Sequence, residues 1–332
     1  MGTDCYSFKN YTPKYLREVI TSMALKRIAV LDLGTNTFHL LITDVENGLV
    51  KNEVLKNYLP VKMGEGGINK KFITTEAFNR GIIAIKAFDQ IIKQYNVNQI
   101  KAVGTSAIRD ASNGEDFINR VKSETGIEIE IIDGNREAEL IYKGVIAAVT
   151  IKDEPVLIMD IGGGSVEFII CNSSQIFWKK SYPIGAARLM ETFHHNDPIS
   201  KSNIQEINDF LDESLKGLVY NFLKFKPNIL IGSAGAFETF AELVTLKFNL
   251  PKEKLLETEY VFDLNQVNEV LIDLLKSNHS ERSNNVAIIP LRVDMIIVAT
   301  VLTKYIIKTF KITSLKLSNY SLREGVLFDL LK

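Results

Sequence analysis

The feature that most constrains the fold of this chain is a short segment that occurs twice. It reads Asp-Leu-Gly-Thr-Asn-Thr at 32–37 and Asp-Ile-Gly-Gly-Gly-Ser at 160–165. Each copy follows one run of apolar residues and precedes another, a pattern that predicts two strands joined by a tight turn. Because a domain-sized stretch of chain separates Asp32 from Asp160, we expect an internal repeat of two similar domains.

The composition of the two turns predicts phosphate binding. Glycines let several backbone N–H groups converge on one anion, and hydroxyl and amide side chains add further donors. A Walker loop would instead end in Gly-Lys-Ser/Thr before a helix, and the sequence has no such string. Ordinary glycine turns remain the alternative for either copy alone. The candidate phosphate-binding residues are Gly34, Thr35, Asn36 and Thr37 in the first turn and Gly162, Gly163, Gly164 and Ser165 in the second.

Length and charge narrow the class of protein. A chain of 332 residues exceeds one typical hydrophobic core and favours two domains. Its 39 basic residues balance 40 acidic ones, so we expect no nucleic acid and no membrane as partner. Cys5 and Cys171 form no metal-binding pattern, and no apolar run is long enough to span a bilayer, which favours a cytoplasmic protein. Residues 1–23 are interpreted as an N-terminal extension without assigned chemistry.

Hydrophobic periodicity predicts the remaining elements in order. In the first half we expect strands at 27–33, 38–45, 49–57, 99–103 and 127–132, helices at 75–95, 113–125 and 136–149, and a loop at 104–110. In the second half we expect strands at 156–161, 166–171, 175–182, 228–231 and 312–317, helices at 186–194, 202–224, 265–276, 291–308 and 321–330, and a loop at 232–236 that opens another helix.

Several polar residues fall where such elements end. Arg109 follows a strand, where an arginine can clamp a phosphate or pair with a surface carboxylate. Glu137 lies in the first turn of a helix, where it can stabilise the helix dipole or position a water. Asp160 and Glu167 together are candidate Mg²⁺ ligands, as is Asp32, although a solvated Glu167 is the common alternative.

A third small-residue loop and the histidines complete the candidates. Gly232, Ser233 and Gly235 open a helix, and helix N-termini accept anions. The four histidines, which include His39, show no metal-binding spacing and are interpreted as structural or surface residues.

The order of strands, phosphate hairpins and strand-end loops resembles the actin, sugar kinase and 70-kilodalton chaperone superfamily. Seven motifs more narrowly resemble the exopolyphosphatase/guanosine pentaphosphate phosphohydrolase family, in its short form without the C-terminal HD-type domain. These motifs begin at Asp32, Gly104, Arg136, Asp160, Pro183, Gly232 and Leu322. The resemblance implies an α/β fold of two ribonuclease H-like domains flanking a cleft. Domain I would comprise 24–146 and 320–332, with the final helix packed back on it, and domain II would comprise 147–319.

The resemblance also implies an activity. The expected reaction is hydrolysis of a terminal phosphoanhydride with release of orthophosphate, by a homodimer with Mg²⁺ as cofactor. Glu137 matches the catalytic glutamate that activates water, Arg109 and the two turns match the phosphate-binding groups, and Asp160 and Glu167 match the acids associated with Mg²⁺. At Pro290-Leu291 the chain departs from relatives, which commonly have glycine after this proline.

Three functions stay open at this level. The first is hydrolysis of inorganic polyphosphate, guanosine pentaphosphate or both, which the sequence does not rank. The second is transfer of phosphate from polyphosphate to a nucleoside diphosphate, which the kinase-like fold permits. The third is a catalytically weak sensor of guanosine tetraphosphate or pentaphosphate, against which the retained acids Glu137, Asp160 and Glu167 argue.

Overall fold

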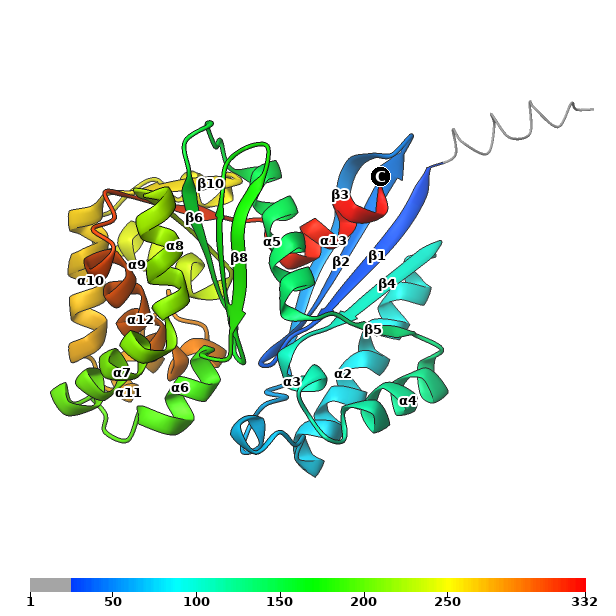
Figure 1. Ribbon diagram of the computed structural model, residues 1–332. Helices are drawn as coiled ribbons and strands as arrows, with labels where there is room; N and C mark the ends of the chain where they lie inside the picture. The colour runs from blue at the N-terminus through cyan, green and yellow to red at the C-terminus, as the bar shows by residue number, and fades with distance from the viewer. Residues whose placement is uncertain (1–24) are drawn as a thin grey trace, which may run out of the picture.

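Two mixed β-sheets stand side by side in the computed structural model, which describes residues 25–332 (Figure 1). The expected N-terminal extension at 1–23 lies outside the described residues. The first sheet has the order β3-β2-β1-β4-β5. Its strands are β1 (Lys26–Leu33), β2 (Thr37–Glu46), β3 (Leu49–Pro60), β4 (Gln99–Gly104) and β5 (Ile129–Ile131). The second has the order β10-β11-β9-β6-β7-β8. Its strands are β6 (Val156–Ile161), β7 (Val166–Cys171), β8 (Ile176–Tyr182), β9 (Ile229–Ser233), β10 (Glu259–Phe262) and β11 (Ser314–Ser318).

The two sheets share one topology, which confirms the internal repeat. In each, a first strand pairs antiparallel with the next strand of the chain and parallel with a later one. The two hairpins also share a register, because Asp32 faces His39 across the first hairpin as Asp160 faces Glu167 across the second. β10 is an additional edge strand that pairs antiparallel with β11. The chain therefore has the two-domain, actin-like α/β fold.

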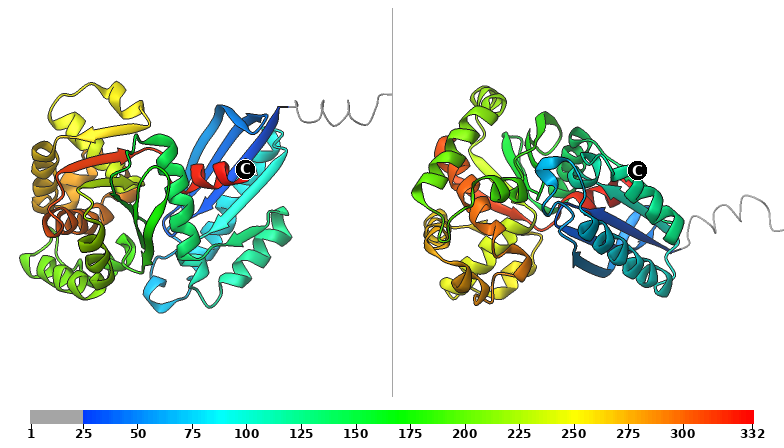
Figure 2. Two further views of the ribbon diagram at one scale, coloured as in Figure 1. Left: turned by 45° about the horizontal axis from the view of Figure 1, so that its top comes forward. Right: turned by 90° about the horizontal axis from the view of Figure 1, so that it is seen from below.

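Helices cover both sheets, and two of them lie between the sheets. Beside the first sheet pack α2 (Thr75–Gln94) and α4 (Gly114–Thr125), with η1 (Ile68–Lys70) and α3 (Ser106–Arg109) near the strand ends. With the second sheet pack α6 (Ala186–Phe193), α7 (Lys201–Ser214), α8 (Lys216–Phe225), α9 (Gly235–Lys247), α10 (Leu264–Lys276) and α12 (Met295–Thr309), together with the short η2 (Lys252–Leu256), α11 (His279–Ser283) and η3 (Pro290–Arg292). Figure 2 shows α5 (Gly134–Ala148) and α13 (Leu322–Leu330) between the sheets.

Glycines allow α5 and α13 to pack closely together. A Cβ on Gly325 would lie 1.8 Å from the carbonyl oxygen of Leu140, and one on Gly144 would lie 2.2 Å from that of Ser321. Side chains of both helices share a third core with residues of β1 and β6, such as Val30 and Ile158. The last helix therefore returns to α5 and β1, far from its neighbours in the sequence.

Several sequence predictions need correction. The strand expected at 127–132 covers only Ile129–Ile131, and the strand expected at 49–57 continues to Pro60. The loop at 104–110 contains the single turn α3, and the expected helix at 202–224 is two helices that meet at the fully buried Leu215. The expected helix at 291–308 begins at Met295, after a 3₁₀ turn that starts with Pro290. The strand predicted to end at 231 continues to Ser233, because it pairs with β6 and β11. In residues 25–332 no helix combines the length and apolarity needed to cross a bilayer.

Candidate active site

A cavity of about 460 Å³ lies between the two hairpin turns. Most of the predicted site residues line it: Asp32, Gly34, Thr35, Asn36, Thr37, Glu137, Asp160, Gly162, Gly163, Gly164, Ser165 and Gly235. Four predicted residues, Arg109, Glu167, Gly232 and Ser233, lie outside its wall. Gly232 belongs to β9, where a Cβ would lie 2.1 Å from the ring of Phe237. This glycine therefore allows α9 to pack on its own strand.

The two turns have the same internal geometry and lie in contact with each other. Gly34 N–H donates to the carbonyl of Thr37 (3.1 Å), and Gly162 N–H donates to that of Ser165 (3.0 Å). A Cβ on Gly163 would lie 2.4 Å from the amide nitrogen of the Asn36 side chain. The two halves of the molecule therefore meet at these turns, and the absence of a side chain at Gly163 permits the close approach.

The second turn is held by the N-terminus of α6. The N–H groups of Ala186 and Ala187 donate to the carbonyls of Gly162 (2.9 Å) and Gly163 (2.8 Å). Because C=O and N–H point in opposite directions in a trans peptide, the N–H groups of Gly163 and Gly164 face away from α6. Among the described residues neither N–H has a hydrogen-bond partner. Such free, converging N–H groups are suited to bind an anion.

Substitution of Gly185, which precedes α6, tests this packing. A Cβ there would lie 2.4 Å from the carbonyl oxygen of Gly163. We expect Gly185→Ala to cost about 1–3 kcal/mol of unfolding free energy, as overpacking does elsewhere, and to lower turnover by displacing the turn. Thermal unfolding and a phosphate-release assay measure the two effects. Gly217→Ala, within α8, is the matched control, and equal behaviour of the two variants would contradict the prediction.

Asp160, Glu167 and Glu137 are buried at the site and Asp32 is half-buried there; serine hydroxyls hold two of these four carboxyl groups. Asp160, at the end of β6, accepts hydrogen bonds from Ser233 and Ser321 (2.6 Å to the latter). Glu167 accepts one from Ser181 (2.6 Å). Asp32 accepts no side-chain hydrogen bond from any residue in 25–332, so its oxygens remain available to a ligand.

Burial and mutual repulsion raise the pKa values of these carboxyl groups. Burial is the main cause for Asp32, whose pKa rises to about 7 although Arg323 opposes the shift. Burial and then the charge of Asp160 raise the pKa of Glu167 to about 7. Burial also raises the pKa of Asp160, against the hydrogen bonds from its serines. Several carboxylates packed together and shielded from bulk solvent favour a bound cation or protonation.

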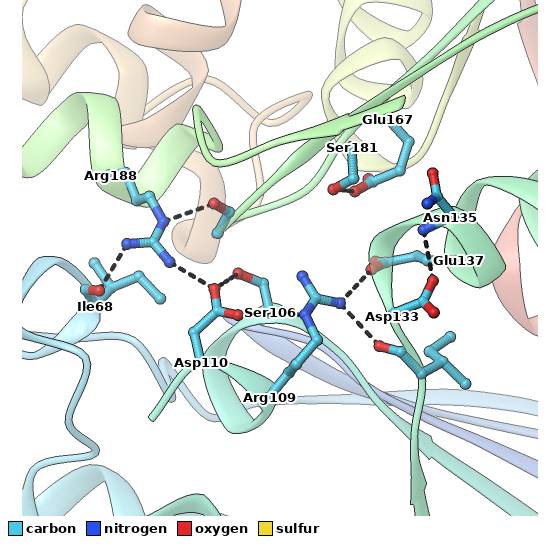
Figure 3. Close-up of polar contacts among 12 residues, drawn as sticks. Ile68, Ser106, Arg109, Asp110, Asp133, Asn135, Glu137, Glu167, Ser181 and Arg188 are labelled. Carbon is cyan, nitrogen blue, oxygen red and sulfur yellow. Dashed lines mark hydrogen bonds and ion pairs between the residues drawn. The ribbon is translucent and has the colours of Figure 1, made fainter. Parts of the chain in front are cut away.

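Glu137 is turned toward Arg109. Asp133 is the N-cap of α5, since its side chain accepts from the N–H groups of Asn135 and Arg136 (both 2.8 Å). Glu137, one turn along, pairs instead with Arg109, with 3.0 Å between Nη1 and Oε2 (Figure 3). Burial and the charge of Glu167 raise the pKa of Glu137 well above its usual value, and Arg109 opposes this shift. Such a perturbed carboxyl group is typical of a catalytic base.

Several histidine, lysine and arginine residues that line the cavity were not assigned to the site from the sequence. His39, interpreted as structural or surface, lines the cavity and accepts a hydrogen bond at Nδ1 from Arg323 (2.7 Å). Burial and then Arg323 lower the pKa of His39 well below its usual value, so the ring is neutral. Lys56 and Arg292 also line the cavity. The internal repeat could have indicated that His39 lies at the site, because His39 occupies the hairpin position equivalent to Glu167.

Comparison with known proteins identifies the family. Residues 41–332 match the Ppx/GppA phosphatase family. The chain belongs to this family. A crystal structure of an exopolyphosphatase from Cytophaga hutchinsonii is 41% identical, with a TM-score of 0.89 over 92% of this chain and 98% of that chain. A structure of the Aquifex aeolicus PPX-GPPA enzyme is 25% identical, with a TM-score of 0.75 over 92% of this chain and 100% of that one.

Curated relatives agree with the family assignment. Exopolyphosphatase 1 of Mycobacterium leprae is 25% identical over 91% of this chain and 88% of its own length. A bifunctional 3-dehydroquinate synthase/phosphatase of Fusobacterium nucleatum is 34% identical over 85% of this chain, which spans only 43% of that protein. This Ppx/GppA family member is thus a phosphatase. The candidate active site is the cavity between the two hairpin turns, at 34–37 and 162–165, which are called the first and second glycine turns below.

Proposed function

We propose that this protein hydrolyses the terminal phosphoanhydride of inorganic polyphosphate, of guanosine pentaphosphate, or of both, and releases orthophosphate. The observation that carries the proposal is that both glycine turns and Glu137 line one and the same cavity. Two of the related proteins are named exopolyphosphatases, and their names support polyphosphate as one substrate.

The residues of the site can supply the chemistry. Phosphoryl transfer needs mainly positioning and neutralisation of charge. The free N–H groups of Gly163 and Gly164 would hold the terminal phosphate, and Arg109 would add a positive charge beside Glu137. Glu137, when ionised, would accept a proton from the attacking water at Oε1 or Oε2. A positioned base of this kind contributes about 10²- to 10⁴-fold in rate.

Mg²⁺ is a proposed cofactor, and the carboxylates present suit it. Within residues 25–332 no three His, Cys, Asp or Glu side chains converge closely enough to hold a metal ion directly. Mg²⁺ usually keeps several waters and takes one or two carboxylates plus substrate phosphates. Asp32 and Asp160, which line the cavity, would supply the carboxylates, and Glu167 lies behind them. The ion would neutralise charge on the phosphates.

The cavity also contains cations for the rest of a polyanionic substrate. Lys56, Arg292 and Arg323 lie in its wall and come from separate elements of both halves of the molecule. Arg292 donates to Glu238 (2.7 Å) and Arg323 to Glu324 (3.1 Å), so each is already positioned by a carboxylate. These cations fit further phosphates of either substrate class.

Orthophosphate release tests the proposal. Purified protein is incubated with tripolyphosphate, long-chain polyphosphate or guanosine pentaphosphate, with Mg²⁺ or with EDTA. We expect release from at least one substrate, with a loss of at least tenfold in EDTA. No orthophosphate release from any of the three substrates would contradict the proposed hydrolase activity. Equal rates in EDTA would contradict the role of Mg²⁺.

A further inference from the structure

Arg188, in the first turn of α6, joins the two halves of the molecule beside the cavity. Its Nε donates to the carbonyl of Gly164 in the second glycine turn (2.8 Å). Its Nη1 donates to the carbonyl of Ile68 (2.7 Å), and its Nη2 to Oδ2 of Asp110 (3.0 Å) (Figure 3). The side chain is only 11% exposed. Every nitrogen of the guanidinium therefore has an acceptor, one in the second half of the chain and two in the first.

Asp110 connects Arg188 to Arg109. One oxygen of Asp110, Oδ2, accepts from Arg188 and from the hydroxyl of Ser106 (3.1 Å). The other, Oδ1, lies 3.3 Å from Nε of Arg109, a longer contact. On its far side Arg109 bonds to Glu137 and to the carbonyl of Ile132 (both 3.0 Å). An unbroken set of contacts thus runs from the second glycine turn through Arg188, Asp110 and Arg109 to Glu137.

The division of Asp110 between two arginines decides how much positive charge Arg109 can offer to a phosphate. Charge-assisted hydrogen bonds are among the strongest in proteins, and a carboxylate prefers a two-pronged pair with one guanidinium. With Arg188 and Ser106 on Oδ2, Asp110 meets Arg109 through Oδ1 alone. Nη2 of Arg109 has no partner among the described residues, and Figure 3 shows it directed toward the side where Glu167 and Ser181 lie. If Arg188 were lost, Asp110 would be free to pair fully with Arg109.

We propose that Arg188 is a positioning residue for the phosphatase reaction. By occupying one oxygen of Asp110 it keeps Arg109 available to the substrate phosphate, and by bonding Gly164 it aligns the second glycine turn with Arg109. This inference rests on the proposed function, because it assumes that the substrate phosphate meets Arg109. The other Arg188 contact, to the carbonyl of Ile68, holds the guanidinium in place between the two halves of the molecule.

A double-mutant cycle between Arg188 and Asp110 tests the proposal. We expect Arg188→Gln to lower kcat/KM for orthophosphate release by about 10- to 100-fold, the range for loss of one charged hydrogen-bond partner. Adding Asp110→Asn removes the competing carboxylate, so the double variant should recover at least fivefold over Arg188→Gln. A purely structural Arg188 would give a double variant no better than the single one, and this outcome would overturn the proposal.

Two further variants distinguish the positioning role of Arg188 from a general effect of contacts between the two halves and from misfolding. Arg188→Lys keeps the positive charge near Asp110 and should retain more activity than Arg188→Gln. The melting temperatures of these two variants should be similar. Asn69→Ala removes another contact between the halves, from Asn69 to Glu191 (2.8 Å), that touches neither Arg109 nor a glycine turn. It should keep kcat/KM within twofold of the wild type. A loss of kcat/KM as large as that of Arg188→Gln would show that weakening any contact between the two halves lowers activity. This result would contradict the proposal.

Binding of tripolyphosphate, measured by calorimetry on the same variants, needs no turnover. If the wild type releases no orthophosphate, the proposed hydrolase activity is contradicted. The double-mutant cycle is then evaluated from the affinities of the variants for tripolyphosphate. The expected order of affinity is wild type, double variant, then Arg188→Gln. Equal affinity of all three would overturn the role of Arg188 whether or not the protein is a hydrolase.

Discussion

Replacing Glu137 with Gln should lower kcat for orthophosphate release by about 10²- to 10⁴-fold, the usual contribution of a positioned base. The amide has nearly the same shape and can still accept a hydrogen bond from Arg109 through its oxygen, but it cannot take a proton from water. The fold should persist, because Asp133 rather than Glu137 caps α5. Phosphate release at saturating substrate and thermal unfolding give the two readings.

A second carboxylate on the same helix provides the control for this variant. Glu139 is half-buried and lies outside the cavity wall, where it pairs with Arg136 (2.9 Å) and lies near Lys143 (3.3 Å). Glu139→Gln should keep kcat within twofold of the wild type. If Glu137→Gln is folded and turns over as fast as Glu139→Gln, Glu137 is not the base.

Replacing Asp32 with Asn should stabilise the ligand-free protein while lowering its activity. The pKa of Asp32 is about 7 in the folded protein and close to 3.8 when the chain is unfolded. Between these values the folded state binds more protons than the unfolded state, so folding stability falls as pH rises from about 4 to about 7. Asn carries no charge and avoids this loss. We therefore expect a gain on the order of 3 kcal/mol in unfolding free energy at pH 8 and little gain at pH 4.

Denaturant unfolding of the ligand-free protein at the two pH values measures this difference. Asp116→Asn, on the exposed side of α4, is a control that should change stability by less than about 0.5 kcal/mol at either pH. Phosphate release by Asp32→Asn should fall at least tenfold, because the variant lacks a carboxylate that the cavity presents to the substrate and its Mg²⁺. Destabilisation of Asp32→Asn at pH 8 would contradict the raised pKa that burial gives Asp32.

The repeated hairpins made much of the fold predictable. The pairing of Asp32 with Asp160 as equivalent residues predicted two similar sheets, and both turns lie at one cavity as expected. Glu137 was placed correctly in the first turn of a helix. The alternation of apolar and polar residues along a strand or helix is a local signal, and these features depend mainly on it.

The features that were missed depend on contacts between distant segments. β10 is four residues long and becomes a strand only by pairing with β11, more than 50 positions later. The sequence placed Arg109 at the site but could not show that it pairs with Glu137, since α3 and α5 meet only in the folded chain. Arg188 lies in an ordinary amphipathic helix, and only the folded chain brings it to Asp110.

Hydrolysis of tripolyphosphate in water enriched with ¹⁸O tests the central claim most directly. If Glu137 activates water to attack the terminal phosphorus, each orthophosphate released should carry one ¹⁸O atom, as mass spectrometry would show, and Glu137→Gln should release almost none. Orthophosphate without solvent oxygen would show attack at another phosphorus. Consumption of tripolyphosphate only in the presence of ADP, with ATP formed instead of orthophosphate, would show transfer, and either result would contradict the proposed reaction.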